Sequence, residues 1–171
     1  MKRTLLALAA IGLLVLGCDS STTTSPTDGT PSFGSGSTVV HRVTAGGSDV
    51  DLAGPGGDAN FSLVGLLRAD GSASGQWTDQ FGHGNGGFHA AIDCVHVVDN
   101  EAWVSGTVTS GNFQGFDLTG FPVIARLADN GRSANDPPDQ ISFSFLGDQT
   151  PCTAAPLFDL FDKTRGQVTV D

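Results

Sequence analysis

The sequence predicts an all-β domain, and three observations support that prediction. Apolar and polar residues alternate with a period of two in many short stretches from residue 38 onward, as half-buried strands do. The 18 acidic side chains include a single glutamate, Glu101, and aspartate favours turns where glutamate favours helices. The 24 glycines also argue against a helical bundle. We expect a small antiparallel up-and-down β-barrel of about eight strands, with a β-sandwich as the alternative.

The first half of the domain alternates four strand patterns with turn signals. Strands are expected at 37–43, 59–68, 73–81 and 88–98, with a further short strand at 50–52. "ADGS" at 69–72 is a hairpin turn, and "GHGNGG" at 82–87 is a second turn. In the strand 88–98, we place Phe88, Ala90, Ile92, Cys94, His96 and Val98 on the buried face, because this set is the more apolar of the two.

The second half contains four more strand patterns, at 102–109, 121–128, 140–147 and 166–170. A Gly/Phe-rich link, "SGNFQGFDLTGF" at 110–121, and a long loop at 129–139 separate the first three. Residues 157–162 are expected to form one or two helical turns. A chain that ends in a strand can supply the last rung of a barrel, and closure removes exposed edges.

The amino-terminal segment is an export signal. Lys2 and Arg3 precede an apolar run of about 13 residues, which is too short to span a bilayer but suits the core of a signal peptide. "VLGC", Val15 to Cys18, resembles the lipobox of bacterial lipoproteins. The resemblance implies cleavage after Gly17, diacylglycerol on the Cys18 thiol, and an amino end that accepts a further acyl chain such as palmitate. Two or more acyl chains anchor a protein stably to a membrane.

Three regions follow from this interpretation. Residues 1–17 are a lipoprotein signal peptide that forms a helix, 18–37 are the lipidated cysteine and a disordered Ser/Thr/Pro/Gly tether, and 38–171 are a single β domain. The expected location is the bacterial cell envelope, on the periplasmic face of the outer membrane or at the cell surface. Asp19 leaves the inner membrane open as well, because it resembles the retention signal of enterobacterial lipoproteins.

The net charge excludes one class of function, and the number of cysteines predicts a disulfide. Cleavage removes Lys2 and Arg3, which leaves 6 basic against 18 acidic side chains and a formal charge of −12. Such a chain is repelled by nucleic acid, so nucleic-acid binding is excluded. With Cys18 lipidated, Cys94 and Cys152 remain as an even pair in an oxidising compartment, and we expect them to form a disulfide.

A second resemblance covers most of the chain from Phe61 to Asp171. "DGSASGQW", "GGFHAAIDCVHVVDNEAWVSGTV" and "LADNGRSANDPPDQISFSF", followed by a late cysteine, resemble a group of uncharacterised glycine-rich secreted bacterial β domains. The motifs consist of turns, strand cores and a cysteine pair. The resemblance therefore implies a shared fold and no particular activity.

The candidate functional residues are few. Asp129, Asn130, Asp136 and Asp139 offer oxygen ligands to calcium, but their spacing does not match an EF-hand loop. Phe113, Phe116 and Phe121 lie among glycines in the link, where they would be exposed as a contact for a ligand or a partner. No catalytic motif or cofactor-binding motif is present. We expect a non-enzymatic binding or structural envelope domain; the alternative is a small β-barrel enzyme acting on a small apolar or sugar substrate.

Overall fold

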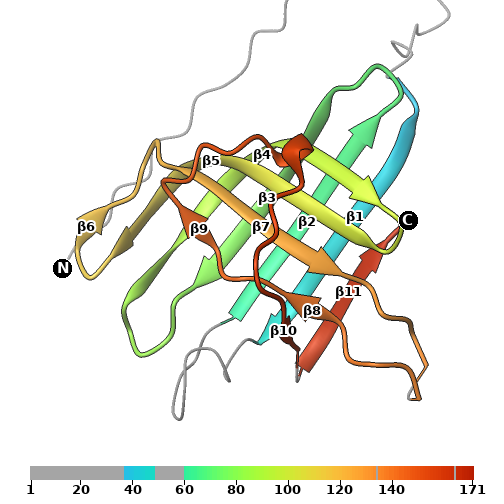
Figure 1. Ribbon diagram of the computed structural model, residues 1–171. Helices are drawn as coiled ribbons and strands as arrows, with labels where there is room; N and C mark the ends of the chain where they lie inside the picture. The colour runs from blue at the N-terminus through green and yellow to red at the C-terminus, as the bar shows by residue number, and fades with distance from the viewer. Residues whose placement is uncertain (1–36, 49–59, 134, 164) are drawn as a thin grey trace, which may run out of the picture. The chain divides into compact units, whose positions relative to one another are not determined.

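The domain is an antiparallel β structure, which confirms the predicted class. The computed structural model describes residues 37–48, 60–133, 135–163 and 165–171, all within one compact unit, Gly36–Asp171. These residues form eleven strands of one sheet and one turn of 3₁₀ helix, η1, at Cys152–Ala154 (Figure 1). The strands are β1 Val39–Ser48, β2 Asn60–Arg68, β3 Ala73–Gln80, β4 Gly86–Val98, β5 Glu101–Phe113, β6 Phe116–Asp117, β7 Pro122–Ala128, β8 Gln140–Ile141, β9 Phe145–Leu146, β10 Phe161–Asp162 and β11 Arg165–Val170.

The strands follow one another as a meander. The order across the sheet is β10-β8-β7-β5-β4-β3-β2-β1-β11, while β6 pairs with β5 and β9 pairs with β7. The last strand, β11, returns to pair with the first, with Val170 opposite Val43. The carboxyl-terminal strand thus lies beside β1 as an edge strand of the sheet.

The core lies on the inner face of the curled sheet. Alternate residues of the long strands point into it, among them Leu63 on β2, Trp77 on β3 and Val104 on β5, each at most 1% exposed. Burying one such large apolar side chain contributes roughly 1.5–3 kcal/mol. The period-two pattern of the sequence is therefore the pattern of this core.

One β-bulge changes which residues of β4 face the core. Ile92 pairs with Gly106 and Cys94 pairs with Ser105, so Asp93 is an extra residue without an opposite partner. An extra residue reverses the alternation beyond it. Beyond Asp93, Val95 is buried in the core in place of Cys94. The predicted inward orientation is right for Phe88, Ala90 and Ile92 and wrong for Cys94, His96 and Val98.

The strand ladder does not close on itself within the described residues, and its two ends are β10 and β11. Side chains bridge them. Asp139, just before β8, accepts a hydrogen bond from the backbone N–H of Val168 at 2.6 Å, and Asp129, just after β7, accepts one from Val170 at 3.0 Å. We call this junction the seam. The sheet is thus half of a barrel, and two carboxylates take the place of the predicted closing rung.

Three further predictions need correction, and one lies outside the described residues. The strand expected at 140–147 is split into β8 and β9, because the backbone N–H and hydroxyl of Ser142 both bond to the backbone of Arg126. Residues 157–162 form no helical turn and end in β10. The 3₁₀ turn η1 lies earlier in the chain, at Cys152–Ala154. The link at 110–121 contributes the end of β5 and all of β6. The short strand expected at 50–52 lies outside the described residues.

Candidate functional site

The outer face of β4, β5 and β7 is apolar and is covered by the chain itself. Residues 148–160, which we call the strap, cross this face. Trp103, Ile124 and Cys152 form a second buried cluster there, and Phe158 and Ala155 of the strap pack against it. The Phe145 and Phe158 rings stack with their centroids 4.0 Å apart. The β4 bulge is what turns Cys94 outward toward this cluster.

The predicted disulfide between Cys94 and Cys152 is present, with the two Cα atoms 6.2 Å apart. It joins β4 to η1 across 58 positions of sequence. Cys152 is fully buried. The bond therefore fixes the strap to the outside of the sheet, whereas the sequence pattern had placed Cys94 inside.

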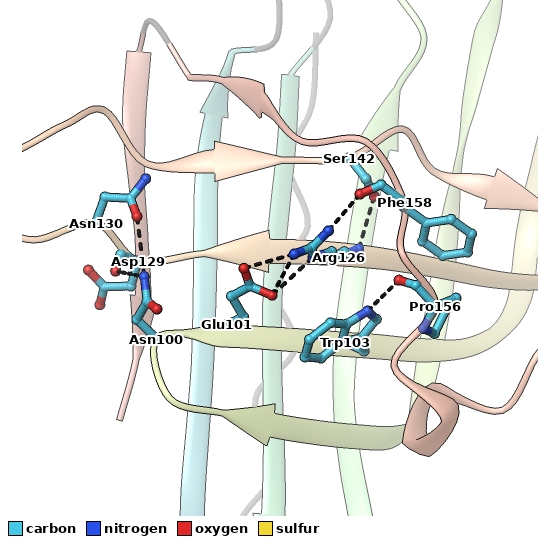
Figure 2. A network of polar contacts seen from close by, with 9 residues as sticks. All are labelled: Asn100, Glu101, Trp103, Arg126, Asp129, Asn130, Ser142, Pro156 and Phe158. Atoms are coloured by element: carbon cyan, nitrogen blue, oxygen red, sulfur yellow. Dashed lines mark hydrogen bonds and ion pairs between the residues drawn. The ribbon is translucent and has the colours of Figure 1, made fainter.

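Polar contacts hold the rest of the strap (Figure 2). The indole N–H of Trp103 donates to the carbonyl of Pro156 at 2.9 Å, and Nη1 of Arg126 donates to the carbonyl of Phe158 at 2.9 Å. Nε and Nη2 of Arg126 also donate to the Glu101 carboxylate, at 3.0 Å and 2.8 Å. Because these groups bond to the strap and to each other, we interpret the network as structural. Sequence reasoning missed it, because the predicted strand begins at residue 102 and leaves out Glu101, whereas β5 begins at Glu101.

The phenylalanines of the link form an exposed patch at one end of the sheet. Phe113 and Phe116 are directly opposite each other in the β5–β6 hairpin and are 44% and 61% exposed. Phe81 contacts Phe113 with ring centroids 5.5 Å apart, and Phe121 contacts Phe116 at 5.8 Å. The structure thus brings together all three residues named from the sequence and adds Phe81. We call these four residues the Phe patch.

The Phe patch is continuous with the core. Phe113 pairs with Gly86, and two residues earlier Gly111 pairs with the buried Phe88, so Phe113 follows the alternation of the inner face. The Phe81 ring lies 5.8 Å from Phe88, which in turn lies 5.2 Å from Trp77. A row of rings therefore runs from the buried centre to the surface and supports Phe113 from beneath.

A negative charge lies beside the Phe patch. The Asp117 carboxylate accepts hydrogen bonds from the hydroxyl of Thr119 at 2.7 Å and from its backbone N–H at 2.9 Å. These bonds lower the pKa of Asp117 below its ordinary value, because they favour the charged form. Asp117 is therefore ionised at neutral pH.

The four calcium candidates lie around the seam, where they bond to the chain itself. Oδ1 of Asp139 accepts from the N–H of Asn130, Oδ1 of Asp129 accepts from Gly131, and Oδ2 of Asp136 accepts from Ser133. The side-chain amide of Asn130 donates to the Pro138 carbonyl. Across the described parts of the chain, no three His, Cys, Asp or Glu side chains gather as a metal site. These residues have a visible role in shaping the loop.

Polar residues also lie inside the sheet, and sequence reasoning missed them too. Asp79 is 6% exposed and accepts a hydrogen bond from the hydroxyl of Ser144. Lys163 is 7% exposed, donates to the carbonyls of Gly46 and Arg165 at 3.0 Å, and lies 4.4 Å from the ring centroid of Phe61. Because Asp79 is two residues after Trp77 on the same strand, period-two alternation places both side chains on the inner face of the sheet. The partner of Asp79 came from a segment 65 residues away.

The predicted lipidation site, Cys18, lies outside the described residues, as do the signal peptide and almost all of the tether. Where the structure does describe the chain, it contains no helix with the length and apolar character needed to cross a membrane.

The fold and the surface together define a class: an all-β domain with a disulfide-anchored strap and an exposed aromatic patch. The chain matches no protein-family model, no curated protein and no solved structure. Its function must therefore be argued from its own residues.

Proposed function

We propose that this protein is a bacterial lipoprotein, anchored to the envelope through Cys18, whose β domain is a non-enzymatic binding module for another envelope protein. The lipobox-like "VLGC" and the polar segment after it support the anchor. The Cys94–Cys152 disulfide supports an exported protein, because such bonds persist in oxidising compartments.

The Phe patch is the observation on which the binding role depends. Two neighbouring rings, 44% and 61% exposed, place large apolar surface in water on a domain that buries Phe61, Trp77, Phe88 and Trp103. Exposed apolar clusters mark interaction surfaces, and aromatic residues dominate the energetics of protein interfaces. The row of rings beneath Phe113 keeps it in place, so little side-chain freedom is lost on binding.

The form and charge of the Phe patch favour a protein partner. The two most exposed rings project from a hairpin and form a surface that a flat or concave protein face can cover. A membrane is disfavoured, because the mature chain carries a formal charge of −12 and anionic lipid repels it. The ionised Asp117 at the margin favours a partner with a basic rim around an apolar centre.

Mass spectrometry of the mature amino end tests the anchor. We expect a diacylated or triacylated peptide that begins at Cys18, and a Cys18→Ser variant that is released from membranes. An unmodified peptide that starts before residue 18 would overturn the lipoprotein assignment.

Site-specific photo-crosslinking in intact cells tests the binding surface. A photoreactive phenylalanine at position 113 or 116 is expected to trap one defined envelope protein, and the same group at Leu157, which is 86% exposed, is expected not to trap it. Phe116→Ser should abolish the crosslink from position 113. Equal trapping from position 157, or crosslinks to lipid alone, would contradict the proposed surface.

A further inference from the structure

The outer face of β2 to β5 differs from the strap-covered half of the sheet. Two of its cross-strand rows are small and polar: Ser62, Thr78, His89 and Ser110 are opposite one another in one row, and Gln80, Gly87 and Asn112 form the next. The row on the other side is mixed and consists of Val64, Gln76, Ala91 and Thr107. Hydroxyl, carboxamide and imidazole groups provide donors and acceptors without a fixed charge. Neither of the two polar rows contains a Lys, Arg, Asp or Glu, in a chain with 18 acidic side chains.

This face is hollowed into adjoining cavities. A cavity of about 540 Å³ is lined by Thr78, Gln80, His89 and Asn112, together with Asp79, Phe88 and glycines of the β3–β4 turn, β4 and β5. Asp79 is 6% exposed, and its carboxylate accepts a hydrogen bond from Ser144. Two cavities of about 270 Å³ each adjoin it, and Thr78 lines all three. We call the three together the outer groove. From β2 to β5 it crosses three strand spacings of ~4.8 Å, or roughly 14 Å.

Two local features shape the larger cavity. A Cβ at Gly87 would collide with the carbonyl oxygen of Asp79, so this position holds glycine and leaves a gap between the flanking Gln80 and Asn112. At the floor, Thr78 Oγ1 and the imidazole Nδ1 of His89 lie 3.0 Å apart and are hydrogen-bonded, which orients both polar groups across two strands. The groove is thus built by the sheet register.

We propose that the outer groove binds a neutral oligosaccharide. A sugar chain offers many hydroxyls, each a donor and an acceptor, to match the hydroxyl, carboxamide and imidazole groups of the rows. No Lys or Arg lines the three cavities, so the groove lacks the cations that an anionic polymer needs. An extended peptide prefers an unpaired strand edge, whereas β2, β3 and β4 are paired on both sides. This site is on the face opposite the Phe patch, so it is independent of the proposed protein partner.

Calorimetry on the full mature protein, in a sugar-free zwitterionic detergent, tests this inference. The probes are maltohexaose, cellohexaose, xylohexaose and chitohexaose, with a hexamer of galacturonic acid as the anionic comparison. We expect at least one neutral hexamer to bind and the anionic hexamer not to bind. If no neutral hexamer binds at millimolar concentration, or if the acid binds equally well, the inference is wrong.

Variants locate the site. Thr78→Ala combined with His89→Ala should weaken binding at least tenfold, and Ala91→Arg, which places a long side chain in the groove, should abolish it. Thr169→Ala on β11 is the matched control, because it removes a hydroxyl from a strand outside the groove. Phe113→Ser with Phe116→Ser should leave sugar binding intact. An equal loss in the Thr169→Ala control, or no loss in the groove variants, would overturn the assignment.

Discussion

Asp139 lies at the seam between the two ends of the sheet, and replacing it tests whether its carboxylate holds the edge strand β11 in place. Asp139 is 8% exposed, and both carboxylate oxygens accept a hydrogen bond: Oδ1 from the N–H of Asn130 at 2.9 Å, and Oδ2 from the N–H of Val168 at 2.6 Å. Val168 is fully buried. Removing the carboxylate leaves a donor of the edge strand β11 without its partner in a place that excludes water.

The expected cost follows from these two bonds. A hydrogen bond to a charged group contributes about 1.5–3 kcal/mol. Asp139→Ala removes both bonds and should lower the free energy of unfolding by about 3–6 kcal/mol, which is a large part of the roughly 5–15 kcal/mol of a typical domain. Asp139→Asn keeps one acceptor oxygen in the same shape, so it should cost about half as much, roughly 1.5–3 kcal/mol.

Urea unfolding, followed by the fluorescence of the buried Trp77 and Trp103, measures this effect. We expect the midpoint to fall while the m-value stays constant, and the Val168 amide to exchange its hydrogen faster. Asp93→Asn, at the exposed bulge residue, is the matched control and should change stability by less than about 0.5 kcal/mol. If Asp139→Asn costs no more than this control, the seam does not hold the sheet as we argue.

Three more predictions concern the strap and the turns. Replacing both Cys94 and Cys152 by serine opens a loop whose ends are 58 positions apart. It should lower the free energy of unfolding, measured with denaturant, by roughly 4 kcal/mol. A change below about 1 kcal/mol would contradict a stabilising role of the disulfide. Arg126→Met should expose the strap to limited proteolysis by removing the contact with the Phe158 carbonyl, and unchanged cleavage would show that this contact is dispensable. Hydrogen bonds from Ser72, Thr119 and Thr150 lower the pKa of Asp70, Asp117 and Asp148, respectively. These three turns therefore stabilise the folded state fully above pH ~3.9, and this stabilisation is lost as the pH falls through the lowered pKa values of the folded protein. Thr119→Ala should therefore raise the pKa of Asp117 in an NMR titration, and an unchanged pKa would refute the turn as its cause.

Much of the candidate site was predictable because it depends on local pattern. Large apolar residues among glycines outside a strand pattern predict Phe113, Phe116 and Phe121 as a contact surface. The structure brings all three together, with Phe113 and Phe116 exposed and Phe121 partly buried against the core. The sequence does not predict a place for Phe81 in this patch, because Phe81 ends a different strand pattern and joins the others only by sheet pairing. The Arg126–Glu101 network was missed for the same reason, since its strap partner is 32 residues away.

The sequence alone determined the all-β class, the positions of most strands and the pairing of Cys94 with Cys152. These depend on short-range alternation, turn chemistry and cysteine count. Only the tertiary structure decided that Cys94 faces outward and that carboxylates bridge the seam. The reason is physical: a single extra residue at Asp93 reverses every later side chain of β4, and the partner of an unpaired backbone N–H is chosen by chain segments far away in sequence.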